Sequence, residues 1–284
     1  MPTSPYLTPD MWKRICSYPK GKRDASMKIV GREEFRRCAD DILYWLDPTR
    51  HLIPYVYTRD PKDLYACNLC ANDNAIQFDK RGIHLLYRHD IQADTEPEFK
   101  SFFTPVPKIR SLTMMPYFGP IISILQTQQL VAIEKSRDMQ MTWLVIAFYF
   151  WDTYFHDGRQ NLFQSENAQK TRELVSRVDT IYTNMPKWLK LHKGFTSEGN
   201  NRAGLFRVPS LQSEIIGFPA GADKVRMYHP TGFFSDEAAF NPDAGECFGA
   251  IKPALSGGGR YTALSTANPS FFYYICRDLV PEVV

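Results

Sequence analysis

The chain has 284 residues, of which 44% are hydrophobic and 14% aromatic, so it can bury a large core and falls between one large domain and two. Its formal net charge of +3, from 34 Lys and Arg against 31 Asp and Glu, excludes a general nucleic-acid coat and makes any DNA contact local. The N-terminus does not resemble a secretory signal. The longest apolar run, 144–151, is far shorter than the roughly 20 residues of a membrane span. We therefore expect a globular cytoplasmic protein that is not secreted.

The first region, residues 1–104, is predicted to be a small α+β accessory region. Apolar residues at helical spacing predict a helix over 32–46, and short apolar runs follow at 53–57 and 75–78. The Pro-containing stretch 103–108 is the predicted linker to the second region.

The second region, residues 105–284, is predicted to be an α/β domain with a mainly parallel sheet flanked by helices. From residue 130 onward, short strand patterns alternate with helical patterns, which is the sequence form of such a sheet. The predicted strands cover 130–133, 161–164, 215–216, 232–235 and 261–264, and the predicted helices cover 142–155 and 167–183. Polar or small residues follow each strand, where an α/β sheet presents its ligand-binding edge.

The first candidate site is a phosphate-binding loop between the first strand and the first helix of this second region. Such a loop wraps backbone N–H groups around phosphates at a helix N-terminus, and its final hydroxyl residue binds Mg²⁺. Only Thr142 fits the usual eight-residue pattern over 135–142. Lys135 and Gln140 replace its two glycines, and Met141 replaces its lysine. An ordinary turn with a solvated basic pair is the alternative.

Two other predicted strands end in polar residues. Asp236 and Glu237 follow the strand at 232–235. In phosphoryl-transfer ATPases the first carboxylate of such a pair helps to hold Mg²⁺, and the second can deprotonate the attacking water. The segment 265–268 ends another strand in hydroxyl and amide residues. A solvated charge pair and a simple turn are the corresponding alternatives.

In this order and spacing, the elements resemble the large terminase subunits of tailed double-stranded DNA viruses. The resemblance covers roughly residues 105–275. It is carried by a deviant phosphate loop (Walker A) at 134–143, a strand and a helix end at 163–168 and 185–189, an acidic pair (Walker B) at 236–240 with its approach at 223–226, and a coupling motif at 265–268. It implies a P-loop NTPase fold of the ASCE, RecA-like class.

The resemblance also implies a binding site for ATP and Mg²⁺. Thr142 would bind Mg²⁺ directly, Asp236 would hold it through water, and Asn268 would sense the γ-phosphate. The loop residues that would bind ATP are Lys135, Ser136, Arg137, Asp138, Met139, Gln140, Met141, Thr142 and Trp143.

Catalytic roles follow from the same resemblance. Glu237 would be the catalytic base, and Lys135 would neutralise phosphate charge in place of the missing lysine, with Arg137 assisting. Arg226 is the candidate for stabilising the transition state as an arginine finger across a subunit boundary, and the other arginines predicted to lie in loops are Arg202, Arg207 and Arg260. Gln140 departs from the family, because a glycine there allows close backbone approach to phosphate and a positive φ. This departure concerns nucleotide affinity and not the fold.

As a packaging motor, the chain would hydrolyse ATP to move double-stranded DNA into a procapsid. The implied partners are double-stranded DNA, a portal protein, a small terminase subunit and further copies of the chain in a ring that associates weakly in isolation. The implied location is the host cytoplasm, with transient binding to the procapsid. Only 16 residues follow Asn268, 284 minus 268, so we expect the usual C-terminal nuclease domain to be absent.

A structural zinc site is a separate candidate in the first region. Cys67, Cys70, His84 and His89 have the spacing Cys-x2-Cys-x13-His-x4-His, which suits tetrahedral Zn²⁺. The expected core aromatic residue after the second cysteine is absent, and Gly82 interrupts any helix that carries the histidines. Buried reduced thiols and half-exposed histidines are the alternative.

Two other functions stay open. A helicase-like ATPase acting on single strands would keep the nucleotide site, although the sequence downstream has no helicase signature and no clear aromatic stacking platform. A degenerate P-loop protein without ATPase activity would account for Gln140 and Met141.

Overall fold

The protein is described by a computed structural model over residues 17, 19–47, 55–57, 65–67, 103–105, 109–112, 114–137, 139–187, 189–199, 202–218 and 225–277. The chain forms two compact units, one from 1–54 together with 112–284 and the other from 55–111. The predicted division between residues 104 and 105 does not coincide with these units, because the N-terminal helices belong to the larger one.

The two N-terminal helices are α2 (Lys20–Asp40) and α3 (Ile42–Trp45). The predicted helix over 32–46 therefore begins earlier and is interrupted at Asp41, whose side chain accepts a hydrogen bond from the Leu43 N–H at 2.8 Å and caps α3. Trp45 packs edge-on against Phe155, the last residue of the buried helix α7 (Met141–Phe155). This aromatic contact joins the N-terminal helices to the larger unit.

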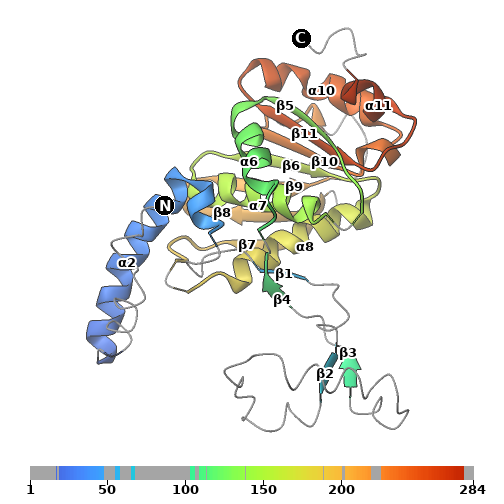
Figure 1. Ribbon diagram of the computed structural model, residues 1–284. Coiled ribbons are helices and arrows are strands. Elements are labelled where there is room, and N and C mark those ends of the chain that lie inside the picture. Colours follow the sequence, from blue (N-terminus) through green and yellow to red (C-terminus); the bar gives the residue numbers. More distant parts are fainter. Residues whose placement is uncertain are drawn as a thin grey trace. The chain divides into compact units, whose positions relative to one another are not determined.

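Figure 1 shows the seven-stranded sheet of the larger unit, with strand order β5-β11-β10-β6-β9-β8-β7. The strands are β5 (Leu130–Glu134), β6 (Gln160–Gln164), β7 (Phe195–Gly199), β8 (Arg202–Val208), β9 (Ser213–Gly217), β10 (Gly232–Asp236) and β11 (Arg260–Ser265). The first five in this order are parallel, and the hairpin β7–β8 adds an antiparallel edge. All the predicted strands of this region are present. Strand β11 lies between β5 and β10. The predicted α/β fold, with a mainly parallel sheet flanked by helices, is confirmed.

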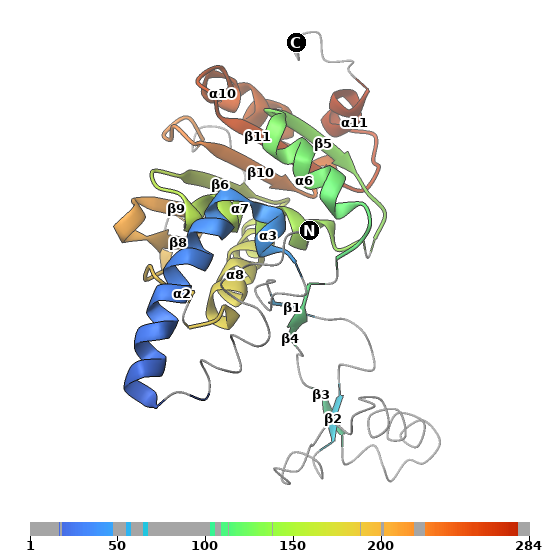
Figure 2. The ribbon, with the colours of Figure 1, turned by 60° about the vertical axis from the view of Figure 1, so that its left-hand side comes forward.

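Helices cover both faces of the sheet (Figure 2). On one face lie α7 and α8 (Ala168–Asn184), with α6 (Phe118–Thr127) beside α7. On the other lie α10 (Ala244–Ser256) and α11 (Phe271–Cys276), and short 3-10 turns occur at η4 (Pro209–Leu211) and η5 (Ala238–Phe240). The predicted helices 142–155 and 167–183 are confirmed as α7 and α8. Every residue from 143 to 155 is buried, as the apolar run predicts.

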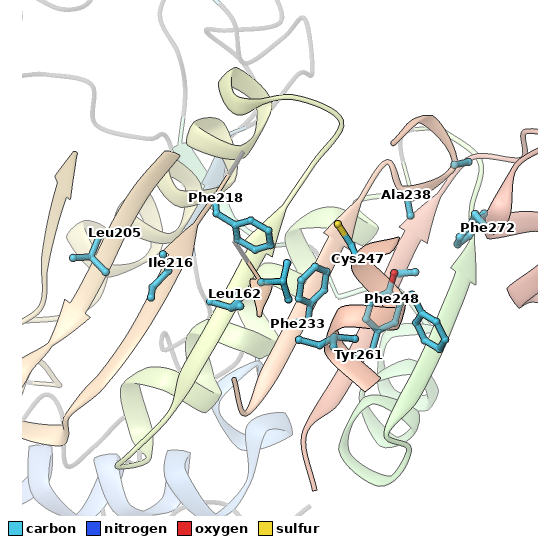
Figure 3. Packing of buried hydrophobic residues seen from close by; sticks show 14 residues of the cluster. Leu162, Leu205, Ile216, Phe218, Phe233, Ala238, Cys247, Phe248, Tyr261 and Phe272 are labelled. Atoms are coloured by element: carbon cyan, nitrogen blue, oxygen red, sulfur yellow. The ribbon is translucent and has the colours of Figure 1, made fainter. Parts of the chain in front are cut away.

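The sheet's core is built from side chains that the parallel register places side by side. Phe233 lies opposite Leu162 on one neighbour and Tyr261 on the other, and the Phe233 and Tyr261 rings stack at 5.3 Å. These residues pack beneath α10 and α11 (Figure 3). On the opposite face, the Tyr149 hydroxyl bonds the Phe233 carbonyl at 3.1 Å and the Thr262 hydroxyl at 3.0 Å. Tyr149 thereby anchors α7 to β10 and β11.

In the smaller unit, β1 (Tyr55–Tyr57) pairs antiparallel with β4 (Ile109–Ser111), and β2 (Tyr65–Cys67) pairs with β3 (Phe103–Pro105). Strand β3 lies inside the predicted linker 103–108, which is therefore in part a paired strand.

The candidate zinc ligands Cys70, His84 and His89, and the apolar run 75–78, lie outside the described residues, as does the side chain of Cys67. Over the described part of the chain, no group of three His, Cys, Asp or Glu side chains could hold a metal ion, so the zinc site stays a prediction. None of the described helices is long and apolar enough to cross a membrane.

Candidate active site

The candidate site lies at the sheet edge where parallel strands β5, β11 and β10 end. Lys135 directly follows β5, Ser265 ends β11 and Asp236 ends β10. The Lys135 N–H donates to the Ser265 carbonyl at 2.9 Å. The carboxyl ends of parallel strands meet at one edge, so residues far apart in the sequence come together there.

Thr142 and Asp236 form the direct link between helix α7 and strand β10. The Thr142 hydroxyl lies in the first turn of α7 and donates to Asp236 Oδ1 at 3.2 Å. Asp236 is only 7% exposed, and this burial raises the pKa of its carboxyl to about 6. The negative charge of Glu237 also raises this pKa, whereas Arg177, Lys135 and the Thr142 hydrogen bond lower it.

Lys135 and Glu237 form an ion pair beside this link. Lys135 Nζ lies 3.5 Å from Glu237 Oε1, and the two side chains are 11% and 25% exposed. The neighbouring Arg137 and Ser136 are exposed. Of the two basic residues in the loop, Lys135 is therefore the one that the structure places against the acidic pair.

Gln140 and Glu237 have left-handed backbone conformations, with φ of 54° and 51°. Such conformations are uncommon for residues other than glycine and cluster at functional sites. Gln140 precedes α7 and adopts the kind of positive φ for which a glycine is usual. Its side-chain oxygen is buried and has no hydrogen-bond partner within the described part of the chain.

Two further residues of the loop, Met139 and Met141, have defined contacts or burial. The Met139 carbonyl accepts a hydrogen bond from the Tyr117 hydroxyl at 3.0 Å, and Met141 is buried at the start of α7. Asp138 lies outside the described residues.

The segment 265–268 contacts the turn that follows the acidic pair. The Ser265 hydroxyl accepts a hydrogen bond from the Ala239 N–H at 3.1 Å, and Asn268 Nδ2 donates to the Ala239 carbonyl at 3.2 Å. Asn268 is thus tied to η5, the turn next to Glu237. The structure brings the predicted coupling motif and the acidic pair together.

Helix α8 contributes two cations near the acidic pair that sequence reasoning missed. The Arg177 guanidinium carbon lies 5.3 Å from the centre of the Trp143 ring, and Arg177 is the first of the charges that lower the pKa of Asp236. Lys170 pairs with Glu166 at 2.8 Å, and this hydrogen bond is the main cause that raises the pKa of Lys170. The two cations are seven residues apart on one helix face, and that spacing is the signal that could have found them.

Arg226 lies in the connection between β9 and β10, and its side chain is exposed. Its predicted role concerns a neighbouring subunit, so it stays a prediction.

The fold and site together define an α/β protein whose mainly parallel sheet gathers a loop, a hydroxyl group and an acidic pair at one edge. A loop precedes a buried helix, an acidic pair ends a strand of the sheet, and an additional strand lies between them. The chain matches no protein-family model and no curated protein.

Among solved structures, the chain is similar to a variant of the large terminase ATPase domain of Thermus phage P74-26, with 14% identity over 57% of this chain and 68% of that chain and a TM-score of 0.42. It is similar to the large terminase of bacteriophage HK97, with 12% identity over 62% of this chain and 38% of that one and a TM-score of 0.48. It is also similar to the large terminase of a thermophilic bacteriophage in complex with ADP, with 8% identity over 54% of this chain and 39% of that one and a TM-score of 0.40. The chain thus spans less than two thirds of either of these two large terminases.

Proposed function

We propose that the chain is a Mg²⁺-dependent ATPase and the motor of viral genome packaging, which translocates double-stranded DNA into a procapsid. The observation that carries the proposal is the contact between Thr142 and Asp236, which are 94 residues apart in sequence and 3.2 Å apart in the structure. A hydroxyl at a helix start and a carboxylate at a neighbouring strand end are the protein groups that hold Mg²⁺ in phosphoryl-transfer sites.

The residues present fit Mg²⁺, because both side chains offer hard oxygen ligands and Asp236 is buried at the site. Bound there, Mg²⁺ would neutralise charge on the phosphates of ATP. A Mg²⁺·nucleotide site needs only one or two protein carboxylates, since phosphate oxygens and water supply the other ligands. Thr142 and Asp236 meet that requirement.

Each remaining residue has a role that its position supports. Glu237 follows Asp236 directly and would accept the proton of the attacking water. Lys135 would neutralise phosphate charge, since a phosphate oxygen in the site would compete with Glu237 for the same ammonium group. Asn268 would report the state of the site through its contact with Ala239.

The proposal extends to partners. Arg226 would act in a neighbouring copy as an arginine finger, so that full activity requires a ring of chains on a portal protein, with a small terminase subunit delivering DNA. The location would be the host cytoplasm and, transiently, the procapsid. These parts of the proposal rest on the resemblance of the motifs.

The test is Mg²⁺-dependent ATP hydrolysis by the wild-type chain and by Glu237→Gln, with and without double-stranded DNA. We expect slow hydrolysis that double-stranded DNA stimulates more than forked or single-stranded DNA does, and that Glu237→Gln removes. Stronger stimulation by single strands would favour the helicase-like alternative. Failure of the wild-type chain to bind a slowly hydrolysed ATP analogue would favour the degenerate loop, for which Gln140 and Met141 are the supporting residues.

A further inference from the structure

A buried pair of amide side chains, Gln164 and Asn241, joins strand β6 to the turn that follows Glu237. Asn241 Nδ2 donates to Gln164 Oε1 at 3.0 Å, and the two residues are 5% and 0% exposed. Gln164 ends β6 and lies opposite Ser235 of β10, the residue before Asp236. The proposed function gives this pair no role.

The surrounding hydrogen bonds fix the direction of the amide pair. The Asp243 N–H donates to Asn241 Oδ1 at 3.0 Å, so the Asn241 amide nitrogen is the atom directed at Gln164. Gln164 therefore presents its oxygen to Asn241, and its Nε2 donates to Cys247 Sγ at 3.4 Å. Loss of either amide would leave a buried polar group of the other without its partner, which is costly.

The turn between Glu237 and Asn241 starts from a strained backbone conformation. Glu237 has a φ of 51°, and such a conformation persists in a residue other than glycine only where the surrounding contacts impose it. Within the turn, the Phe240 N–H donates to the Glu237 carbonyl at 2.9 Å, and the Asn241 N–H donates to the Ala238 carbonyl at 3.4 Å. These bonds transmit a movement of Asn241 to the backbone of Glu237.

The two strands that flank β10 both hold this turn. From β11, the Ser265 hydroxyl accepts a hydrogen bond from the Ala239 N–H at 3.1 Å, and Asn268, which follows β11, donates to the Ala239 carbonyl at 3.2 Å. From β6, Gln164 binds Asn241. Since β10 lies between β6 and β11, the turn at its end is fixed from both sides.

We propose that Gln164 is a positioning residue of the site, which acts through Asn241 to hold the Glu237 carboxylate where it accepts the proton of the attacking water. A general base works only within hydrogen-bond reach of that proton, so a small displacement of the turn lowers the rate. This inference rests on the proposed function and adds to it a residue outside the phosphate loop, the acidic pair and the coupling motif.

The experiment compares two single variants with a matched control. Gln164→Met keeps the length of a buried side chain and removes its amide. Asn241→Ser keeps an oxygen near the Asp243 N–H and is too short to reach Gln164. The control, Gln160→Met, makes the first change at the opposite end of β6, where Gln160 Nε2 donates to Glu214 Oε1 at 3.0 Å.

Three quantities are measured: the kcat of ATP hydrolysis, the affinity for a slowly hydrolysed ATP analogue with Mg²⁺ by calorimetry, and amide hydrogen exchange over 238–241. We expect both variants of the pair to lower kcat roughly tenfold or more, because the base is displaced. Analogue affinity should be unchanged, since the residues proposed to bind Mg²⁺ and phosphate are untouched. Exchange over 238–241 should be faster, because the turn opens more readily.

The double variant, Gln164→Met with Asn241→Ser, should lose no more kcat than either single variant, because all three break the same contact. The Gln160→Met control should match wild type in all three measurements. A purely structural role would lower kcat and analogue affinity together, whereas a positioning role lowers kcat alone.

Unchanged kcat in both variants of an active wild type would overturn the inference alone. Equal loss of kcat and analogue affinity, or loss of the fold in both variants, would show a structural role and would also overturn it. A wild-type chain that hydrolyses no ATP would instead overturn the proposed function, and faster exchange over 238–241 in both variants would then still support the hold of Gln164 on the turn.

Discussion

Lys135 Nζ lies 3.5 Å from Glu237 Oε1, so the residue proposed to neutralise phosphate and the residue proposed as the catalytic base contact one another directly. Both side chains are mostly buried, which reduces screening of the pair by salt. Arg137, two residues further along the loop, is exposed. The two basic residues of the loop should therefore differ sharply when each is removed.

Lys135→Ala should abolish hydrolysis and weaken ATP binding by roughly 1.5–3 kcal/mol, because a charge-assisted contact to phosphate is lost. Arg137→Ala should mainly slow turnover. Calorimetry with an ATP analogue and steady-state turnover measure the two effects. Full affinity and normal turnover in Lys135→Ala, with losses in Arg137→Ala, would reverse the assignment.

Glu237→Gln should leave Mg²⁺·ATP binding nearly intact and remove most hydrolysis, because the change deletes a base and keeps its shape. Asp236→Asn should instead weaken binding that depends on Mg²⁺, because it removes the negative charge that would hold the metal through water. Titrations at several Mg²⁺ concentrations separate the two. Equal loss of binding in both variants would contradict this division of roles.

The pKa of Asp236 has a consequence for stability. Burial raises this pKa from 3.8 to about 6, so the folded chain binds a proton more readily than the unfolded chain between these values. The free energy of unfolding should therefore fall as pH rises through this window, by up to about 3 kcal/mol from this group.

Asp236→Asn should remove this slope and raise the free energy of unfolding at pH 7–8, as measured by denaturant titration across about pH 4 to 8. Asp157→Asn, at an exposed carboxyl, is the control and should keep the wild-type slope. If the free energy of unfolding depended on pH in the same way in all three proteins, the raised pKa of buried Asp236 would not be the cause of that dependence.

Gln140→Gly should leave the free energy of unfolding almost unchanged. Glycine adopts a left-handed backbone conformation at a cost roughly 1–2 kcal/mol lower than other residues. This gain offsets the greater conformational entropy that glycine gives to the unfolded chain. It should raise nucleotide affinity, since glycine lets phosphate approach the backbone. Gln212, with φ of 53°, is a matched control whose change to Gly should affect stability similarly and leave nucleotide affinity unchanged. Weaker binding in Gln140→Gly would mean that the buried amide itself contacts the nucleotide.

If zinc is present, metal analysis should find about one equivalent per chain, and joint replacement of Cys67 and Cys70 by Ser should remove it. A metal-free preparation that is well folded would end this hypothesis.

The sequence alone determined most of the sheet. The strands β5, β6, β9, β10 and β11 and the helices α7 and α8 follow from the alternation of short strand patterns with helical patterns, which is typical of a mainly parallel sheet. Periodicity did not reveal the hairpin β7–β8, whose strand β7 has polar side chains and an exposed Phe195. It also did not show that α2 and α3 join the larger unit, because that depends on the contact of Trp45 with Phe155.

For the candidate site, residue types and order in the sequence predicted Lys135, Thr142, Asp236, Glu237 and Asn268. The tertiary structure decided which of them touch: Thr142 meets Asp236, Lys135 meets Glu237, and Asn268 meets the turn at Ala239. It alone brought Arg177 to Trp143. The physical reason is that the two residues of each pair come from different elements. The distance between them is set by the parallel register of the strands and by the packing of α7 and α8 on the sheet. The residue spacing within a single motif encodes neither of these.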